Sequence, residues 1–149
     1  MGWHDVTIHG ICVQPSTSPD NPLPRLLLDI DYIVRWVHPV APEQHFTFWI
    51  APSTLAFEDV WDFEGDLAFG GMALHLDIDR LHRSAPDDGR GGPVHGSDPG
   101  WHIEGHYFDL RFRATGYHQY VRQAPLHSKR LVLTHHDRGG LGFAETAFA

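Results

Sequence analysis

The segment RLLLDIDYIVRW, residues 25–36, alternates apolar side chains with other side chains at a period of two. Successive side chains of a β-strand point to opposite faces, so this spacing predicts a strand with one fully apolar face. That face consists of Leu26, Leu28, Ile30, Tyr32, Val34 and Trp36. Strands usually run about 5–6 residues, so a strand of this length also predicts a β-bulge or strong coiling. A chain with such a strand must build a sheet that has a buried face.

The same alternation returns along the rest of the chain. Residues 46–50 and 55–57 predict two strands with a kink at 51–53, because Pro52 has no N–H to donate to a neighbouring strand. Further strands are expected over 72–82, within 101–121 and over 130–136. Within 101–121 the pattern places Phe108, Leu110 and Phe112 inward and Asp109, Arg111 and Arg113 outward.

Two segments rich in proline or glycine predict loops, residues 14–24 and residues 84–100. The second is longer than most ordered loops, so it is either a flexible hairpin connection or a lid over a site. Neither loop divides the chain into halves large enough to fold alone. Residues 1–149 are therefore expected to form a single all-β domain, an antiparallel sandwich or partly open barrel of about seven or eight strands.

Charge and cysteine content restrict the partners. The net charge is -8 at pH 7, and the chain lacks the basic stripe that neutralises phosphates, which argues against nucleic acid and against a membrane surface. No apolar run approaches the ~18 residues that cross a bilayer, and the first residues do not form a secretion signal, so a cytoplasmic location is expected. The single cysteine, Cys12, excludes an internal disulfide.

The segment WHIEGHY contains the sharpest catalytic candidate, because His102, Glu104 and His106 have the i, i+2, i+4 spacing that projects to one face of a strand. Imidazole and carboxylate at this spacing suit a divalent metal, namely zinc, iron or manganese, with a further ligand from a neighbouring strand. Gly105 complicates this hypothesis, since glycine within a strand often marks a bulge that would shift His106 out of register. The alternative is a polar strip that faces solvent.

Two pairs of carboxylates occupy alternate positions on predicted strands. The four residues are Asp29, Asp31, Asp77 and Asp79. Carboxylates next to each other on one face repel, so each pair needs a cation, an arginine or water, and Arg111 and Arg113 are candidates for that charge. The pairs are interpreted either as exposed charge ladders and part of an acidic interaction surface, or as a carboxylate site for a metal or substrate.

Five tryptophans are more than a domain of this size can easily bury. If Phe48 faces the core, Trp49 faces the opposite side of the same strand, unless a second layer covers it. Trp49 and Trp61 are therefore the aromatic candidates for an interface with a partner.

Four segments carry a resemblance to a known group: LLLDIDYIVRW, FWIAPSTLAFEDVWD, FRATGYHQYVR, and the RGG turn followed by Leu141 and Phe143. Together they make the chain, from His4 to Phe143, similar to a family of small uncharacterised bacterial proteins. The resemblance implies a free-standing domain. It implies no activity, no catalytic residues and no cofactor.

Our leading hypothesis is a non-enzymatic module that holds a protein partner through acidic and aromatic surface residues. Neutralisation of a basic toxin by an immunity protein is one version, by analogy of size and charge alone. The alternative is a small metal-dependent enzyme or ligand-binding β-barrel that uses the His-x-Glu-x-His strand, and a third possibility is self-association as a structural protein. Convergence of three His, Asp or Glu side chains would favour the metal site, and a flat patch with Trp49 or Trp61 would favour the module.

Overall fold

The computed structural model describes residues 2–68, 76–84 and 98–149. These residues form one antiparallel sheet of nine strands in the order β4-β7-β6-β5-β1-β2-β3-β8, with β9 added to β3. The strands are β1 (Thr7–Gln14), β2 (Arg25–Val37), β3 (Thr47–Glu58), β4 (Trp61–Leu67), β5 (Leu76–Ser84), β6 (Gly100–Gly105), β7 (Phe108–Arg113), β8 (Gly116–Val121) and β9 (Leu126–Ser128). The sheet is not closed, which confirms the expected all-β antiparallel sandwich or open barrel.

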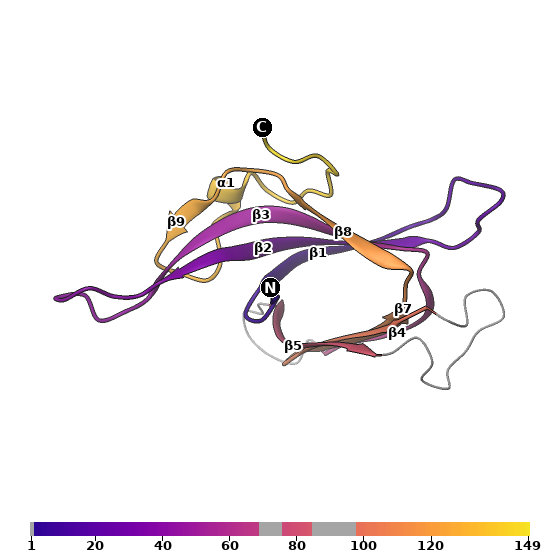
Figure 1. Cartoon of the computed structure of the whole chain (residues 1–149), viewed down its shortest axis with the longest axis horizontal. Helices are drawn as coiled ribbons and strands as arrows, with labels where there is room; N and C mark the ends of the chain where they lie inside the picture. Colours follow the sequence, from indigo (N-terminus) through magenta and orange to yellow (C-terminus); the bar gives the residue numbers. More distant parts are fainter. Residues whose placement is uncertain (1, 69–75, 85–97) are drawn as a thin grey trace.

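The sheet folds over on itself into two layers (Figure 1). The first layer contains β1, β2, β3 and β8, and the second contains β4, β7, β6 and β5. The layers are joined where β1 pairs with β5, through Thr7 opposite Asp77 and Ile8 opposite Leu76. Phe57 of β3 is fully buried between the layers and contacts rings of the second layer, with centroids 5.2 Å from Trp101 and 4.8 Å from Phe112.

Strand β2 forms where the period-two pattern predicts it, and the expected β-bulge lies between Ile33 and Arg35. Leu26, Leu28 and Ile30 are buried in the core. The opposite face of the strand is buried too, with burial extending from residue 27 to residue 31. Strand β2, in the middle of this layer, is therefore covered on both faces. The sequence pattern, with one apolar face, predicts burial of that face only.

Strand β3 runs without interruption through Pro52, so the expected kink at residues 51–53 is wrong. The carbonyl of Pro52 accepts a hydrogen bond from the N–H of Arg122, directly after β8 ends at Val121. The N–H and C=O of one strand residue point to the same side, so the missing donor of Pro52 also faces the end of β8. A proline is tolerated in this central strand because its neighbour ends there.

The second layer follows the predicted inward set, because Phe108, Leu110 and Phe112 are all buried. Arg113 is an exception to the predicted outward set. It is 2% exposed, donates from Nη1 to the carbonyl of Asp98 at 2.7 Å, and lies 5.5 Å from the Trp61 ring centroid. The end of the strand is thus covered by an arginine that a neighbouring segment and an aromatic ring hold in place.

The C-terminal segment, residues 129–149, covers the outer face of the first layer (Figure 1). The expected strand over 130–136 is wrong. After β9 the chain is irregular, and then forms a one-turn helix, α1 (His135–Arg138). Thr134 caps its N-terminus by accepting from the N–H of Asp137, and Gly139 ends it in the left-handed conformation at φ 74°. The capping residues Thr134 and Gly139 therefore favour a helical turn in a segment whose alternating pattern predicts a strand.

Two expectations fall partly outside the described residues. The predicted loop at 84–100 falls outside except for residue 84 and residues 98–100, and the predicted strand over 72–82 is observed from Leu76 onward. The other predicted loop, residues 14–24, connects β1 to β2 and is irregular from residue 15.

Candidate functional site

The outer face of the second layer carries a patch of polar side chains across three strands. His82 of β5 lies opposite His102 of β6, and His102 lies opposite Arg111 of β7. Glu104 of β6 lies opposite Asp109 of β7. Residues directly opposite each other in antiparallel strands share a face. The alternate residues of β6 and β7, namely Trp101, Ile103, Leu110 and Phe112, are buried, so this polar set points outward.

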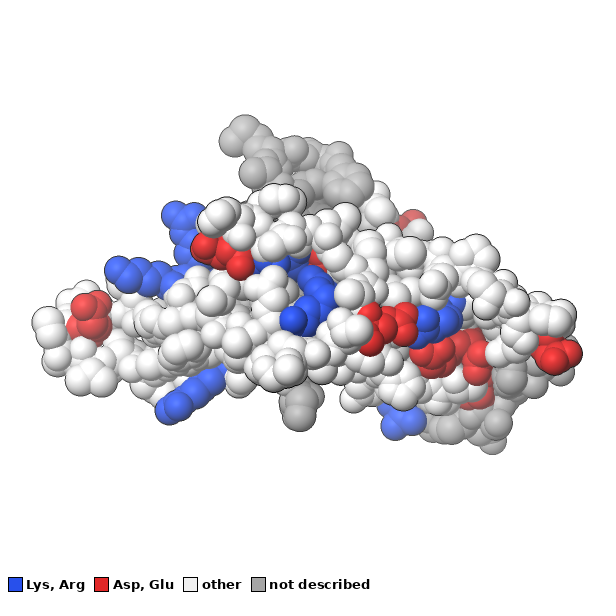
Figure 2. Space-filling view, turned by 90° about the horizontal axis from the view of Figure 1, so that it is seen from above, with Lys and Arg blue, Asp and Glu red and all other residues white. Residues whose placement is uncertain are grey.

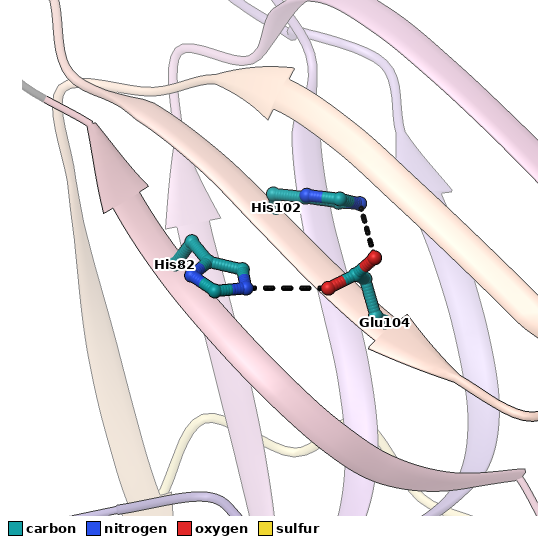
Figure 3. Close-up of side chains that lie close together, drawn as sticks. All are labelled: His82, His102 and Glu104. Carbon is teal, nitrogen blue, oxygen red and sulfur yellow. Dashed lines mark hydrogen bonds and ion pairs between the residues drawn. The ribbon is translucent and has the colours of Figure 1, made fainter.

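Three of these side chains converge. One ligand atom from each of His82, His102 and Glu104 lies within 4.8 Å of the other two (Figure 3). Nε2 of His82 is 3.2 Å from one oxygen of Glu104, and Nε2 of His102 is 3.6 Å from the other oxygen. We call this set the His82–His102–Glu104 cluster.

Asp109 borders the cluster. Its Oδ2 lies 2.9 Å from Nε2 of His102, and its Oδ1 accepts from Nε of Arg111 at 3.3 Å. The hydrogen bond with His102 lowers the pKa of the Asp109 carboxyl and, with the help of Arg111, outweighs the opposite effect of burial. This hydrogen bond uses the same Nε2 of His102 that faces Glu104, so a metal ion at that nitrogen would replace it. Asp109 would then offer a further oxygen within reach of the cluster.

The distances within the cluster fit a metal ion closely enough to test. Zinc takes His nitrogen and carboxylate oxygen at about 2.0–2.2 Å in tetrahedral geometry, which puts neighbouring ligand atoms about 3.3–3.5 Å apart. The two nitrogen–oxygen separations of 3.2 and 3.6 Å bracket that range, but each runs to a different oxygen of Glu104. A metal ion would therefore be held by both carboxylate oxygens, or by one of them after the carboxylate turns. The third separation joins the imidazole nitrogens of His82 and His102. Rotation of the His82 side chain, which is 54% exposed, can adjust it. The cluster offers three ligands and is open to solvent for a fourth.

The His102, Glu104 and His106 triplet expected from the sequence does not form. Strand β6 ends at Gly105, and His106 lies in the turn that follows, 76% exposed and 3.5 Å from Asp79. A Cβ on Gly105 would come within 2.4 Å of the carbonyl of Asp77 and 2.2 Å of the Phe108 ring. The glycine permits this close approach, and the strand ends before His106 can share the face of His102.

His82 was not among the residues predicted from the sequence. It replaces His106 in the cluster because β5 pairs with β6 in the register that places it opposite His102. That register is set by long-range pairing between residues about twenty positions apart. The only sequence signal for His82 is its position at the end of an alternating segment.

Asp29 and Asp31 do not lie on a surface, so their predicted part in an interaction surface is wrong. Both are fully buried beneath the C-terminal segment. Arg138 donates to both carboxylates, and Arg122 donates to Asp29 at 2.6 Å. The expected need for arginines is met, but Arg122 and Arg138 supply the charge rather than Arg111 and Arg113.

Asp77 and Asp79 lie near the start of β5 and are half-buried. Asp77 accepts a hydrogen bond from the hydroxyl of Thr7 at 2.8 Å, which fastens β5 to β1. Asp79 lies beside His106. This pair is accessible in part, and its role in binding a partner stays a prediction.

The two predicted interface tryptophans lie far apart. Phe48 is buried and Trp49 is 39% exposed, as expected for opposite faces of β3, and the Trp49 ring lies 5.2 Å from that of His127. Trp61 is half-buried, and its indole N–H donates to Asp98 at 3.1 Å. Trp49 lies near the start of β3, and Trp61 follows soon after β3 ends at Glu58. Roughly 30 Å of extended strand separates Trp49 from Glu58, so the two tryptophans do not share one patch.

The surface is not uniformly acidic on the face that carries the C-terminal segment. Figure 2 shows Lys and Arg side chains beside Asp and Glu side chains on that face. Interspersed charges of both signs screen one another, so this face does not present one extended negative field.

No family model, curated protein or solved structure matches the chain. In the described part of the chain, no helix is both long enough and apolar enough to cross a membrane.

Proposed function

We propose that this domain binds a divalent transition-metal ion through His82, His102 and Glu104. The observation that supports this proposal is the convergence of three ligand atoms from two strands within 4.8 Å. Two imidazoles and one carboxylate suit zinc, iron and manganese better than they suit calcium or magnesium, which prefer oxygen ligands. Convergence of this kind is the feature that favours a metal site over a protein-binding module.

The chemistry follows from the number of ligands. Three protein ligands leave at least one coordination position for water or substrate, as in catalytic zinc sites, where the bound water becomes a nucleophile near neutral pH. A hollow of about 250 Å³ lies beside the histidines and is lined also by Ser84 and Arg111. Ligand pockets usually measure about 300–1,000 Å³, so this hollow suits a small substrate.

The test is metal binding by protein purified without an affinity tag. We expect one zinc ion per chain by isothermal titration calorimetry and by elemental analysis after dialysis. His82→Ala and His102→Ala should each weaken binding by at least about tenfold, because each removes one of three ligands. His106→Ala is the matched control, since it removes a nearby exposed histidine outside the cluster.

Two results would overturn the proposal. Zinc stoichiometry well below one would show that the cluster is an ion-pair ladder, worth about 0.2–1 kcal/mol per pair. Equal loss of binding in His82→Ala and His106→Ala would show that zinc binds to exposed histidines without selectivity.

A second candidate function, self-association, has its own observation. The tip of the β2–β3 hairpin, residues 34–49, extends away from the body of the domain (Figure 1) and exposes Trp36, Phe46 and Trp49. Strand β1 begins at Thr7, opposite Asp31, so beyond Asp31 one edge of β2 has no neighbouring strand among the described residues. An open edge flanked by exposed aromatic side chains favours pairing with a second copy of this chain.

Sedimentation velocity over a wide range of protein concentrations tests self-association. We expect a monomer–dimer equilibrium that the double variant Trp36→Ala, Trp49→Ala abolishes. Phe148→Ala, which removes an aromatic side chain of similar exposure at the C-terminus, should leave the equilibrium unchanged. A monomer at all concentrations would refute this candidate, and the zinc titration would be unaffected by it.

A further inference from the structure

An aromatic cleft of about 760 Å³ lies between the two layers, on the inner side of β5 and β6. Its walls include Trp3, Tyr32, Trp101 and Tyr117, with Arg83 and Gln119 among the polar residues. The volume lies within the range of about 300–1,000 Å³ that is typical of pockets for small molecules. The cleft is separate from the His82–His102–Glu104 cluster, which faces outward from the same two strands.

The aromatic walls are held in place by one another. The Trp3 ring meets Tyr117 edge to face at 4.9 Å, and Tyr117 meets Trp101 edge to face at 5.5 Å. The indole N–H of Trp3 donates to Gln119 at 3.0 Å. Rings fixed by such contacts keep their orientation without a ligand, so a flat ligand would bind with little loss of side-chain freedom.

The cleft has one positive charge. Among its described lining residues Arg83 is the only charged side chain, and its guanidinium lies 5.5 Å from the Trp101 ring centroid. No carboxylate of the described residues forms an ion pair with it. Arginine binds a carboxylate through two parallel N–H donors, so this position favours an anionic group on a ligand.

The indole N–H of Trp101 is a further polar group of the cleft wall. Trp101 is 5% exposed, and its indole N–H is buried without an acceptor among the described residues. Buried polar groups are nearly always hydrogen-bonded, so an orphan donor in the wall of a pocket points to an acceptor that comes from elsewhere. Burial also raises the pKa of Tyr32, which keeps its hydroxyl protonated as a further donor.

From these observations we infer that the cleft binds a small aromatic carboxylate. The ring system lies among Trp3, Trp101 and Tyr117, and the carboxylate pairs with Arg83 at the rim. Arg83 and Trp101 lie opposite each other in β5 and β6, next to the pair His82 and His102. Because alternate residues of a strand point to opposite faces, none of His82, His102 and Glu104 lines the cleft. Trp101 lines the cleft and also borders the hollow beside the histidines.

The test uses 2-naphthoate and its neutral analogue 2-naphthalenemethanol as probes, followed by tryptophan fluorescence and calorimetry. We expect saturable binding of 2-naphthoate that alters the emission of Trp3 and Trp101. Arg83→Met should weaken it by about tenfold, because one charge-assisted pair is removed. The variant should bind the neutral analogue as tightly as the wild type does.

Two control variants separate the alternatives. Arg80→Met removes an arginine from the same strand outside the cleft and should leave 2-naphthoate affinity unchanged. His82→Ala should also leave it unchanged, so the cleft and the proposed metal site can fail independently. Thermal melts of Arg83→Met verify that it is folded, as expected for an exposed position.

Three outcomes would overturn the inference. Absence of saturable 2-naphthoate binding excludes the ligand class. Equal affinity for the acid and the alcohol in both wild type and Arg83→Met excludes the anion site. Binding that weakens as the protein concentration rises would assign the cleft to a second copy of the chain instead.

Discussion

Arg138 donates to both carboxylate oxygens of Asp29, from Nη1 at 2.9 Å and from Nη2 at 2.7 Å, and neither residue is more than 2% exposed. Asp29 lies in the middle of β2 and Arg138 ends the one-turn helix α1, 109 positions further along the chain. The same oxygens accept from Arg122 and from the backbone N–H of Gly142. This buried network fastens the C-terminal segment to the outer face of the first layer.

Arg138→Met should destabilise the domain by about 3–5 kcal/mol, because it leaves the buried charge of Asp29 short of a partner. Arg138→Lys should recover only part of the loss, since an ammonium cannot reproduce the two-pronged contact. Urea unfolding at neutral pH measures both. Arg130→Met, an exposed arginine in the same segment, is the control and should change the free energy of unfolding by less than about 1 kcal/mol. A loss of less than about 1 kcal/mol in Arg138→Met would contradict the structural role of the Arg138–Asp29 pair.

Acid should weaken the fold through Asp31. Burial acts to raise the pKa of its carboxyl, but the hydrogen bonds from His9 and from the N–H of Leu133, with the charge of Arg138, lower it below 3.8 overall. A carboxyl whose pKa is lower in the folded chain adds stability above its unfolded pKa and loses it as the pH falls through the folded pKa. The free energy of unfolding should therefore fall as the pH drops below about 4.

Urea unfolding at a series of pH values from neutral to acid checks this prediction. Asp31→Asn should start from a lower stability and lose less of it on acidification, because the titrating group is gone. Asp66→Asn, at an exposed position of β4, should keep the slope of the wild type. An unchanged slope in Asp31→Asn would show that other carboxyls account for the acid sensitivity.

Gly105→Ala should lower the melting temperature, because the added Cβ would meet the backbone carbonyl of Asp77 at 2.4 Å and force β5 and β6 apart. Overpacking of this kind typically costs about 1–3 kcal/mol. Gly116→Ala is the matched control, since its Cβ would meet no atom within 4 Å. Calorimetric melts of the two variants should differ clearly, and equal melting temperatures would contradict the close approach at Gly105.

Zinc should stabilise the domain without being needed for folding. The His82–His102–Glu104 cluster lies on the outer face, whereas the core between the layers is apolar and complete without it. At a free zinc concentration one hundred times the dissociation constant, the gain would be about 2.7 kcal/mol. Melts with EDTA and with excess zinc measure it. Unfolding by EDTA would show instead that the metal is structural, and His82→Ala should abolish the zinc-dependent shift.

The sequence by itself determined the class of fold and the identity of its main strand. A period of two over residues 25–36 is a local property, because the direction of each side chain in a strand depends only on its position. The same rule places Phe48 in the core and Trp49 outside it. Alternation also predicts the inward set of β7, where Phe108, Leu110 and Phe112 pack between the layers.

Tertiary structure alone decided which polar residues meet. The sequence places His102 beside Glu104, but the pairing of β5 with β6 brings in His82, and the end of β6 at Gly105 leaves His106 out. Asp29 and Asp31 have the spacing of an exposed ladder, yet they are buried because the C-terminal segment folds back across β2. That segment supplies Arg138, and the residue after β8, Arg122, supplies the second arginine. Strand register and the covering of a sheet face depend on contacts between distant parts of the chain, and local periodicity carries no information about them.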